Sequence, residues 1–338
     1  MSGGTDSSVA AILLLEQGFE LIGITFRFWD EGDNQHLKDA QLLAQQLGIE
    51  HIIYDARSIF REKIVNYFVE EYLVGRTPFP CVKCNNELKW KLIIDEADRL
   101  GCNKVAMGHY VNIIHENEKY FVAEGVDPDK DQSFFLWGLS QSQLSRIVFP
   151  LGKLHKTEVR AMAAERGYKR VSEKKDSLGT CFCTGDYRQF LKRQLSEPHK
   201  FIYPGNFIDE NGNVLGRHEG FPLYTVGQRR GLIHLNRKIF VKEIRSNTND
   251  VVLAPLSSMY KTEFFIRDVN VVDRSLFSNE FDINCRIRYR KQNTLCRVIF
   301  MDNGIAKVEL DEPLESIAPG QTAVFYRDGR ILGGGFIS

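Results

Sequence analysis

The feature that most constrains the fold is an alternation of apolar runs and helical patterns up to about residue 115. The runs at 20–28, 50–56 and 104–110 predict strands, and the patterns at 37–48 and 86–101 predict helices that each end at a glycine. Such alternation indicates a parallel sheet with helices on both faces, which is an α/β fold. Ligands of these folds bind at the carboxyl ends of the strands.

The chain opens with MSGGTDSSVAAILLL, a row of small residues that leads into an apolar helical pattern. The backbone N–H groups of such a turn, together with the helix N-terminus behind it, suit a phosphate or pyrophosphate. A turn of this kind normally follows a buried strand, and no strand pattern precedes it here. We therefore expect either that the natural protein begins further upstream or that its start is misassigned.

The opening stretch differs from a P-loop, because no lysine follows its glycines. It resembles the SGGxDSS signature of ATP-pyrophosphatases, enzymes that adenylate a substrate oxygen and release pyrophosphate. In this interpretation Gly3 and Gly4 let the backbone approach the phosphates, Ser7 and Ser8 donate hydroxyl hydrogen bonds, and Asp6 helps to hold Mg²⁺. The alternative is an ordinary glycine-rich turn before a helix.

Seven cysteines, an odd number at uneven spacings, do not match the disulfide framework of a small secreted domain. Cys81 and Cys84 form a CxxC that follows two prolines and precedes a helical pattern, where the helix dipole is expected to lower a thiol pKa. The alternative is half of a structural zinc site, although the chain has no second CxxC to complete it. Cys181 lies in SEKKDSLGTCFCTGDYRQFL, which is either a reactive loop or a surface loop with a buried cysteine.

The composition excludes some classes of protein. With 338 residues, 43% hydrophobic and 26% charged, the chain is expected to form two or three globular domains. Basic and acidic residues both number 44, so a nucleic acid would have to be bound by local patches. No apolar run has the length of a membrane span and no signal peptide is evident, so we expect a cytoplasmic protein without a membrane partner. From about residue 196, short β-like runs and hairpin turns predict a barrel or sandwich.

The three stretches described above resemble the tRNA-specific 2-thiouridylases, the MnmA/TrmU family. The resemblance continues through MGHYV, GVDPDKDQSFFL, FPLGKLHKTEVRAMA, VLGRHEGFPLYTVGQRRGL, RIRYR and IAPGQTAVFY. The resemblance covers essentially the whole chain and suggests a divergent paralogue that lacks the family's first strand. It implies three domains: an ATP-pyrophosphatase domain of the adenine nucleotide alpha hydrolase kind at 1–195, a small β-rich domain contacting tRNA at 196–262, and a C-terminal β-barrel at 263–338.

The resemblance also implies the reaction. ATP, with Mg²⁺, adenylates O2 of the wobble uridine of a tRNA, and a cysteine-borne sulfur then displaces AMP to give 2-thiouridine. Cys84 would carry the persulfide, and Cys181 would attack it or help to release the sulfur. The implied partners are tRNA and a sulfur donor such as a cysteine desulfurase or a sulfur-relay protein, and the free chain is expected to be a monomer.

The binding residues follow from the same motifs. The implied ATP contacts are Ser2, Gly3, Gly4, Asp6, Ser7, Ser8, Phe26 and Gly108. The implied tRNA contacts are Phe79, Pro80, Cys81, His109, Lys130, Asp131, Gln132, Arg288, Tyr289 and Gln321.

One departure from the family pattern leaves the sulfur chemistry open. Phe79-Pro80-Cys81 stands where the family often has Asn-Pro-Asp. Cys81, Cys84 and Cys181 could together ligate a [4Fe–4S] cluster, although the persulfide route is favoured because it needs no metal. Two other hypotheses are an ATP-pyrophosphatase that acts on a small substrate and an inactive tRNA-binding protein.

Overall fold

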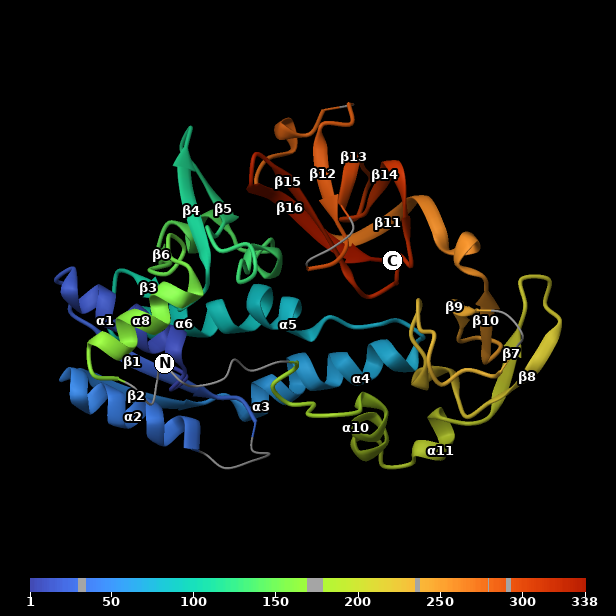
Figure 1. Cartoon of the computed structure of the whole chain (residues 1–338), viewed down its shortest axis with the longest axis horizontal. Helices are drawn as coiled ribbons and strands as arrows, with labels where there is room; N and C mark the ends of the chain where they lie inside the picture. The colour runs from blue at the N-terminus through green and yellow to red at the C-terminus, as the bar shows by residue number, and fades with distance from the viewer. Residues whose placement is uncertain (30–34, 169–178, 235–237, 279, 290–292) are drawn as a thin grey trace. The chain divides into compact units, whose positions relative to one another are not determined.

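The computed structural model describes residues 1–29, 35–168, 179–234, 238–278, 280–289 and 293–338 (Figure 1). The chain divides into two compact units. The first comprises residues 1–64, 81–182 and 328–331, and the second comprises 65–80, 183–327 and 332–338.

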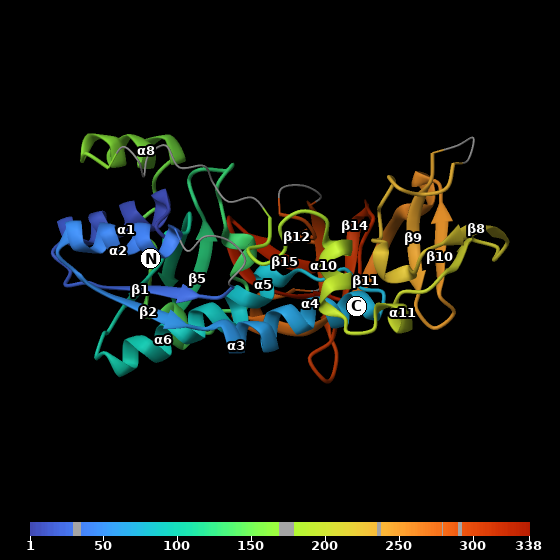
Figure 2. The same cartoon turned by 90° about the horizontal axis from the view of Figure 1, so that it is seen from below.

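The first unit is built on parallel strand pairs. β1 (Ile22–Arg27) pairs with β2 (Glu50–Asp55) in a continuous parallel register, and β3 (Val105–Ala106) pairs in parallel with β6 (Ile147–Val148). Figure 2 shows helices α1 (Thr5–Glu16) and α2 (Gln35–Leu47) on one side of β1 and β2, with α6 (Trp90–Arg99) on the other. The predicted α/β fold is therefore confirmed.

The remaining elements of this unit are helices and one antiparallel β-hairpin. They are α3 (Arg57–Phe60), a π-helix that starts at Arg61 and runs to Val65, α5 (Pro80–Lys83), a second π-helix (Cys84–Lys89), β4 (Val111–Glu116), β5 (Lys119–Glu124), a 3-10 helix (Ser133–Phe135), α7 (Gln141–Leu144) and α8 (Lys156–Glu165). Val9 and Ala10 of α1 pack with Val159 and Ala163 of α8, so α1 is buried along its length.

Two predicted elements differ in detail. The helix expected at 86–101 is interrupted: the chain is a π-helix as far as Lys89 and an α-helix from Trp90. The strand expected at 104–110 pairs only at Val105 and Ala106, because the next residues turn toward the opening loop. Apolar spacing cannot distinguish a π-helix from an α-helix over so few residues.

The second unit contains two sheets. One has the order β8 (Val214–His218), β7 (Gly205–Ile208), β10 (Asp250–Ala254) and β9 (Phe240–Arg245). The other runs β11 (Tyr260–Val271), β14 (Ala306–Glu315), β13 (Asn293–Phe300), β12 (Ile283–Arg286), β15 (Thr322–Arg327) and β16 (Arg330–Ile337), and β11 also pairs with β16. That pairing closes six strands into a barrel and confirms the predicted β-barrel. The helices are α4 (Asn66–Leu73), α10 (Tyr187–Gln194) and α11 (Pro198–Phe201), with 3-10 turns at Phe221–Leu223, Leu256–Met259 and Arg274–Leu276.

Candidate active site

The opening loop is folded as a turn at the N-terminus of α1. Gly3 has a φ of 65° and lies so close to α2 that a Cβ there would be 2.6 Å from the carbonyl oxygen of His36. The Ser7 hydroxyl oxygen accepts a hydrogen bond from the Ser2 N–H at 3.1 Å, and the Ser8 hydroxyl donates to the Gly4 carbonyl at 2.8 Å. The loop thus lies directly before the first turn of α1, which is the place where a helix N-terminus binds an anion.

Gly108 is brought against this loop from the end of β3. A Cβ on Gly108 would lie 2.6 Å from the carbonyl carbon of Asp6 and 2.8 Å from the Ser7 nitrogen. The structure thus brings together the predicted ATP contacts of the opening stretch and of Gly108. Phe26 lies one residue before the carboxyl end of β1, where its ring packs against Phe28 and Tyr54 with centroids 5.6 Å away in each case.

Asp6 is bound by two residues to which sequence reasoning gave no role. Its Oδ1 accepts a hydrogen bond from the Tyr110 hydroxyl at 2.6 Å and from the Lys156 ammonium at 2.6 Å. The Lys156 side chain is only 9% exposed. Tyr110 lies in MGHYV and Lys156 lies in FPLGKLHKTEVRAMA, so both residues belong to motifs that carry the family resemblance. Both hydrogen bonds are to Oδ1, so Oδ2 is the oxygen through which Asp6 could hold a Mg²⁺ ion.

The three cysteines of the predicted sulfur chemistry, Cys81, Cys84 and Cys181, all lie in this unit. Cys81 belongs to α5, Cys84 begins the second π-helix, and Cys181 lies beyond residues 172–178 of its motif, which are outside the described residues. Burial raises the pKa of Cys81 and that of Cys84, while the Lys89 ammonium lowers both. Burial, and then Cys84 and Cys81, raise the pKa of Cys181 to about 12, although the residue itself is exposed.

The expectation that a helix dipole lowers the thiol pKa near Cys81 and Cys84 is therefore wrong. The helix that carries Cys81 has four residues, and loss of hydration outweighs any dipole of that length. What the structure does show is that Cys181 interacts electrostatically with both members of the CxxC.

The three cysteines do not form a ready metal site. Among the residues that the structure describes, no group of three or more His, Cys, Asp or Glu side chains has an arrangement that could hold a metal ion. The [4Fe–4S] hypothesis thus finds no support in the placement of its three proposed ligands.

His109 is enclosed by aromatic rings. Its ring centroid lies 5.8 Å from Trp90 and 6.0 Å from Phe149, and its Nδ1 is buried without a hydrogen-bond partner among the described residues. Burial, and secondarily the Lys89 ammonium, lowers the pKa of His109 to about 3. The imidazole is therefore neutral near pH 7.

The predicted tRNA contacts at 130–132 lie in a loop that their own side chains help to build. Asp131 accepts hydrogen bonds from the Gly125 N–H at 3.0 Å and the Ser133 hydroxyl at 2.7 Å, and burial raises the pKa of its carboxyl group. Gln132 accepts through Oε1 from the Tyr110 N–H at 3.1 Å. Lys130 is half-buried in the same loop. Asp131 and Gln132 thus have structural roles beside any contact with RNA.

The other predicted tRNA contacts belong to the second unit. Gln321 donates through Nε2 to the Thr77 carbonyl at 3.0 Å and to the Pro78 carbonyl at 3.4 Å, so it holds the segment that leads into Phe79 and Pro80. Arg288 is exposed, and its Nη2 lies 3.8 Å from the place a Cβ on Gly227 would take. The RIRYR and TVGQRRGL motifs therefore meet there. Tyr289 is half-buried next to Arg288.

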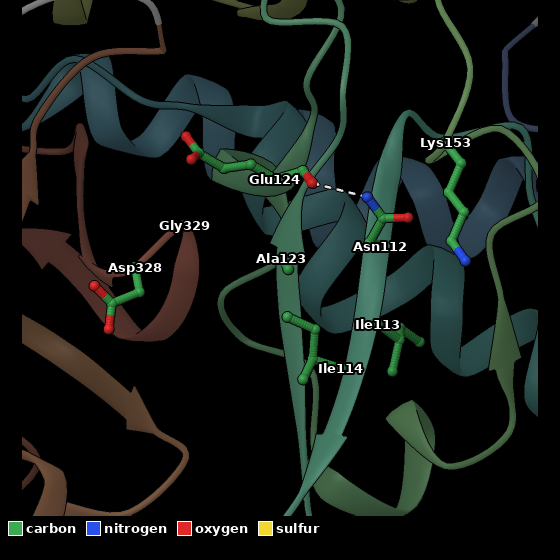
Figure 3. Close-up of a pocket in the computed structure, with 8 residues that line it drawn as sticks. All are labelled: Asn112, Ile113, Ile114, Ala123, Glu124, Lys153, Asp328 and Gly329. Carbon is green, nitrogen blue, oxygen red and sulfur yellow. Dashed lines mark hydrogen bonds between the residues drawn. The ribbon is translucent and has the colours of Figure 1, made fainter.

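A hollow of about 420 Å³ lies along the β4–β5 hairpin of the first unit (Figure 3). It is lined by Asn112, Ile113, Ile114, Ala123, Glu124, Lys153, Asp328 and Gly329. None of these residues was predicted to belong to the site. Asn112 donates to the Glu124 carbonyl at 2.9 Å across it, which is a bond between adjacent strands.

Comparison with known proteins agrees with this architecture. A family model described as a tRNA methyl transferase HUP domain matches residues 1–185. A tRNA methyl transferase PRC-barrel domain matches 188–255, and an aminomethyltransferase beta-barrel domain matches 261–337. Within the described residues, no helix is both long enough and apolar enough to span a membrane.

Full-length relatives are more informative. The chain is 51% identical to the tRNA-specific 2-thiouridylase MnmA 1 of Bacteroides fragilis strain YCH46, over 100% of this chain and 96% of the relative. It is also 51% identical to the tRNA-specific 2-thiouridylase MnmA 2 of Phocaeicola vulgatus, with the same coverage. The tRNA-specific 2-thiouridylase MnmA of Amoebophilus asiaticus is 41% identical over 100% of this chain and 93% of its own length.

The fold and the opening loop define a multidomain enzyme built on a nucleotide-binding HUP domain. Within that class, the chain belongs to the family of MnmA-type tRNA-specific 2-thiouridylases.

Proposed function

We propose that this chain is an ATP-dependent tRNA sulfurtransferase that converts the wobble uridine of tRNA to 2-thiouridine, with Cys84 as the sulfur carrier. The observation that supports it most is the interaction of Cys181 with Cys84 in the unit that carries the opening loop. Cys84 and Cys81 both raise the pKa of Cys181, so these thiols interact although Cys181 is far from the other two in the sequence. Sulfur transfer in this proposal requires cysteines that can react with one another.

The opening loop activates the uridine in this proposal. The N–H groups at the start of α1 would bind the phosphates, together with the Ser7 and Ser8 hydroxyls once these turn away from the Gly4 carbonyl. Phe26 and Gly108 would contact the adenine and ribose. Asp6 Oδ2 would hold Mg²⁺, which neutralises phosphate charge when it is bound. The uridine O2 attacks the α-phosphorus, the bond from that phosphorus to the bridging oxygen breaks, and pyrophosphate leaves.

Sulfur transfer then involves both cysteines. The terminal sulfur of a Cys84 persulfide bonds to C2, and the C2–O2 bond breaks to release AMP. Cys181 attacks the Cys84 sulfur, whose bond to the transferred sulfur breaks, so that its electron pair forms the thiocarbonyl. A Cys84–Cys181 disulfide results, which an external thiol reduces. Because the pKa of Cys181 is about 12, its proton must be removed first, and the Lys89 cation favours the thiolate.

The RNA-binding part of the proposal uses the other motifs. Phe79, Pro80, Cys81 and His109 would surround the target base, and Lys130, Arg288, Tyr289 and Gln321 would contact the tRNA around it. The domains proposed for these tasks are 1–195, 196–262 and 263–338. A persulfide-bearing protein, such as a cysteine desulfurase or a sulfur-relay protein, would supply the sulfur.

The test separates adenylation from sulfur transfer. We expect Cys84→Ser to release pyrophosphate from ATP in the presence of tRNA, yet to form no 2-thiouridine by mass spectrometry of the nucleosides. Cys102→Ser, in the same unit, is the matched control and should thiolate normally. A Cys84→Ser variant that makes normal amounts of 2-thiouridine would refute the assignment, as would wild-type protein that binds tRNA and never thiolates it.

A further inference from the structure

Two buried residues connect the loop at 125–133 to Asp6 of the opening loop. Tyr110 is the first. Its N–H donates to Gln132 Oε1 at 3.1 Å and its carbonyl accepts from the Gln132 N–H at 3.2 Å, while its hydroxyl donates to Asp6 at 2.6 Å. The backbone of Tyr110 therefore holds the 125–133 loop, and its side chain holds the opening loop.

Lys156 repeats this arrangement from the start of α8. Its N–H donates to Asp127 Oδ2 at 2.8 Å, and its ammonium donates to Asp6 Oδ1 at 2.6 Å. A cation in the first turn of a helix is opposed by the helix dipole. The carboxylates of Asp6 and Asp127 compensate for that cost. The backbone N–H and the side-chain ammonium of Lys156 each donate to one of them.

Burial makes these connections stiff. Tyr110 is 2% exposed, Lys156 is 7% exposed and Asp127 is 8% exposed. The Asp6 side chain at the other end is 34% exposed. A buried donor or acceptor that loses its partner costs free energy, so a shift of the 125–133 loop is expected to move Asp6 unless one of these hydrogen bonds breaks.

We propose that Tyr110 and Lys156 are positioning residues that couple the tRNA-contacting loop to the ATP-binding loop through Asp6. Engagement of Lys130 by tRNA would fix the 125–133 loop and, through both residues, the Asp6 carboxylate. ATP would then bind more tightly in the presence of tRNA, and tRNA more tightly in the presence of ATP by the same factor. This inference rests on the proposed function, which assigns ATP to the opening loop and tRNA to Lys130.

The experiment measures that factor directly. The affinity of a non-hydrolysable ATP analogue is measured with and without saturating tRNA, and the affinity of tRNA with and without the analogue. Coupling in proteins is typically about 5–150-fold. We expect the wild-type ratio to exceed one in both directions and to fall toward one in Tyr110→Phe, which removes the hydroxyl but leaves the backbone bonds to Gln132 intact.

Two further variants distinguish positioning from general destabilisation. Lys156→Met should also reduce the ratio, and Lys156→Arg, which keeps the charge and a donor, should restore part of it. Tyr120→Phe is the matched control, because that tyrosine stacks on His115 in the same unit and should keep the wild-type ratio. Melting curves identify any variant that fails to fold, and Tyr110→Phe, the smallest change, then decides the question.

The outcomes separate the inference from the function. If wild-type protein binds both ligands without coupling, or Tyr110→Phe keeps the full ratio, the inference is overturned and the proposed function stands. If wild-type protein binds neither ATP analogue nor tRNA, the proposed function and the inference fail together.

Discussion

Gly108 and Asp6 are in backbone contact: a Cβ on Gly108 would lie 2.6 Å from the carbonyl carbon of Asp6. Only a residue without a side chain fits there, because the atoms opposite it are backbone atoms that cannot rotate away. The segment after β3 can therefore approach the opening loop this closely only because residue 108 is a glycine.

Gly108→Ala should therefore displace the opening loop. We expect a loss of stability of about 1–3 kcal/mol, as for other overpacked sites, and weaker binding of ATP. Urea unfolding and equilibrium nucleotide binding measure the two effects. Gly216→Ala is the control, because its Cβ would meet only the flexible side chain of Ile233 at 3.3 Å. Equal losses in the two variants would contradict the argument.

Gln321 is expected to matter through the chain segment it holds. Gln321→Leu keeps the size of the side chain but removes the donor to the Thr77 and Pro78 carbonyls, which should destabilise the second unit by about 1–2 kcal/mol. At a temperature where the variant is still folded, its thiolation activity should also be lower than that of the wild type. The reason is that the segment held by Gln321 leads directly into Phe79 and Pro80. The exposed Gln189 of α10 provides the control as Gln189→Leu. Wild-type stability in Gln321→Leu would show that these bonds contribute nothing.

Arg288 is exposed and suited to a phosphate contact. In Arg288→Ala the affinity for tRNA should fall, and the slope of log K against log salt concentration should decrease by about one. Filter binding at several salt concentrations gives both values. Arg274→Ala serves for comparison, because that side chain lies over the Phe300 ring, 5.0 Å from its centroid. An unchanged slope with weaker binding would mean that Arg288 acts on the fold and not on a phosphate.

The fold was largely predictable because its signals are local and repeated. Alternating apolar runs and glycine-terminated helices indicated the α/β unit, and hairpin turns indicated the barrel. The change from a π-helix to an α-helix at Trp90 was not predictable, since apolar spacing over six residues does not reveal the hydrogen-bond pattern of the backbone.

The site was predictable only where a short motif contained it. The sequence placed Asp6 in the opening loop, but the pairing of Asp6 with Tyr110 and Lys156 arises from packing between segments far apart in the chain. The thiol pKa near Cys84 was predicted in the wrong direction for the same reason. Burial, which the sequence does not reveal, outweighs the local helix dipole that it does.

His109 should make the protein sensitive to acid. Burial lowers its pKa from an ordinary 6.5 to about 3, so the unfolded chain binds a proton there well before the folded chain does. Stability contributed by the neutral imidazole is therefore present above about pH 6.5 and is lost as the pH falls toward 3. By linkage the loss is about 2 kcal/mol between pH 7 and pH 5.

His109→Phe removes the titrating group and keeps a ring between Trp90 and Phe149. We expect its stability, measured by urea unfolding at pH 7 and pH 5, to change by about 2 kcal/mol less than that of the wild type. His115→Phe, at an exposed position of β4, should retain the acid-linked loss of the wild type. If His109→Phe loses as much stability as the wild type between these pH values, then His109 gains a proton in the folded protein as readily as in the unfolded chain. Its aromatic enclosure would not then keep it neutral.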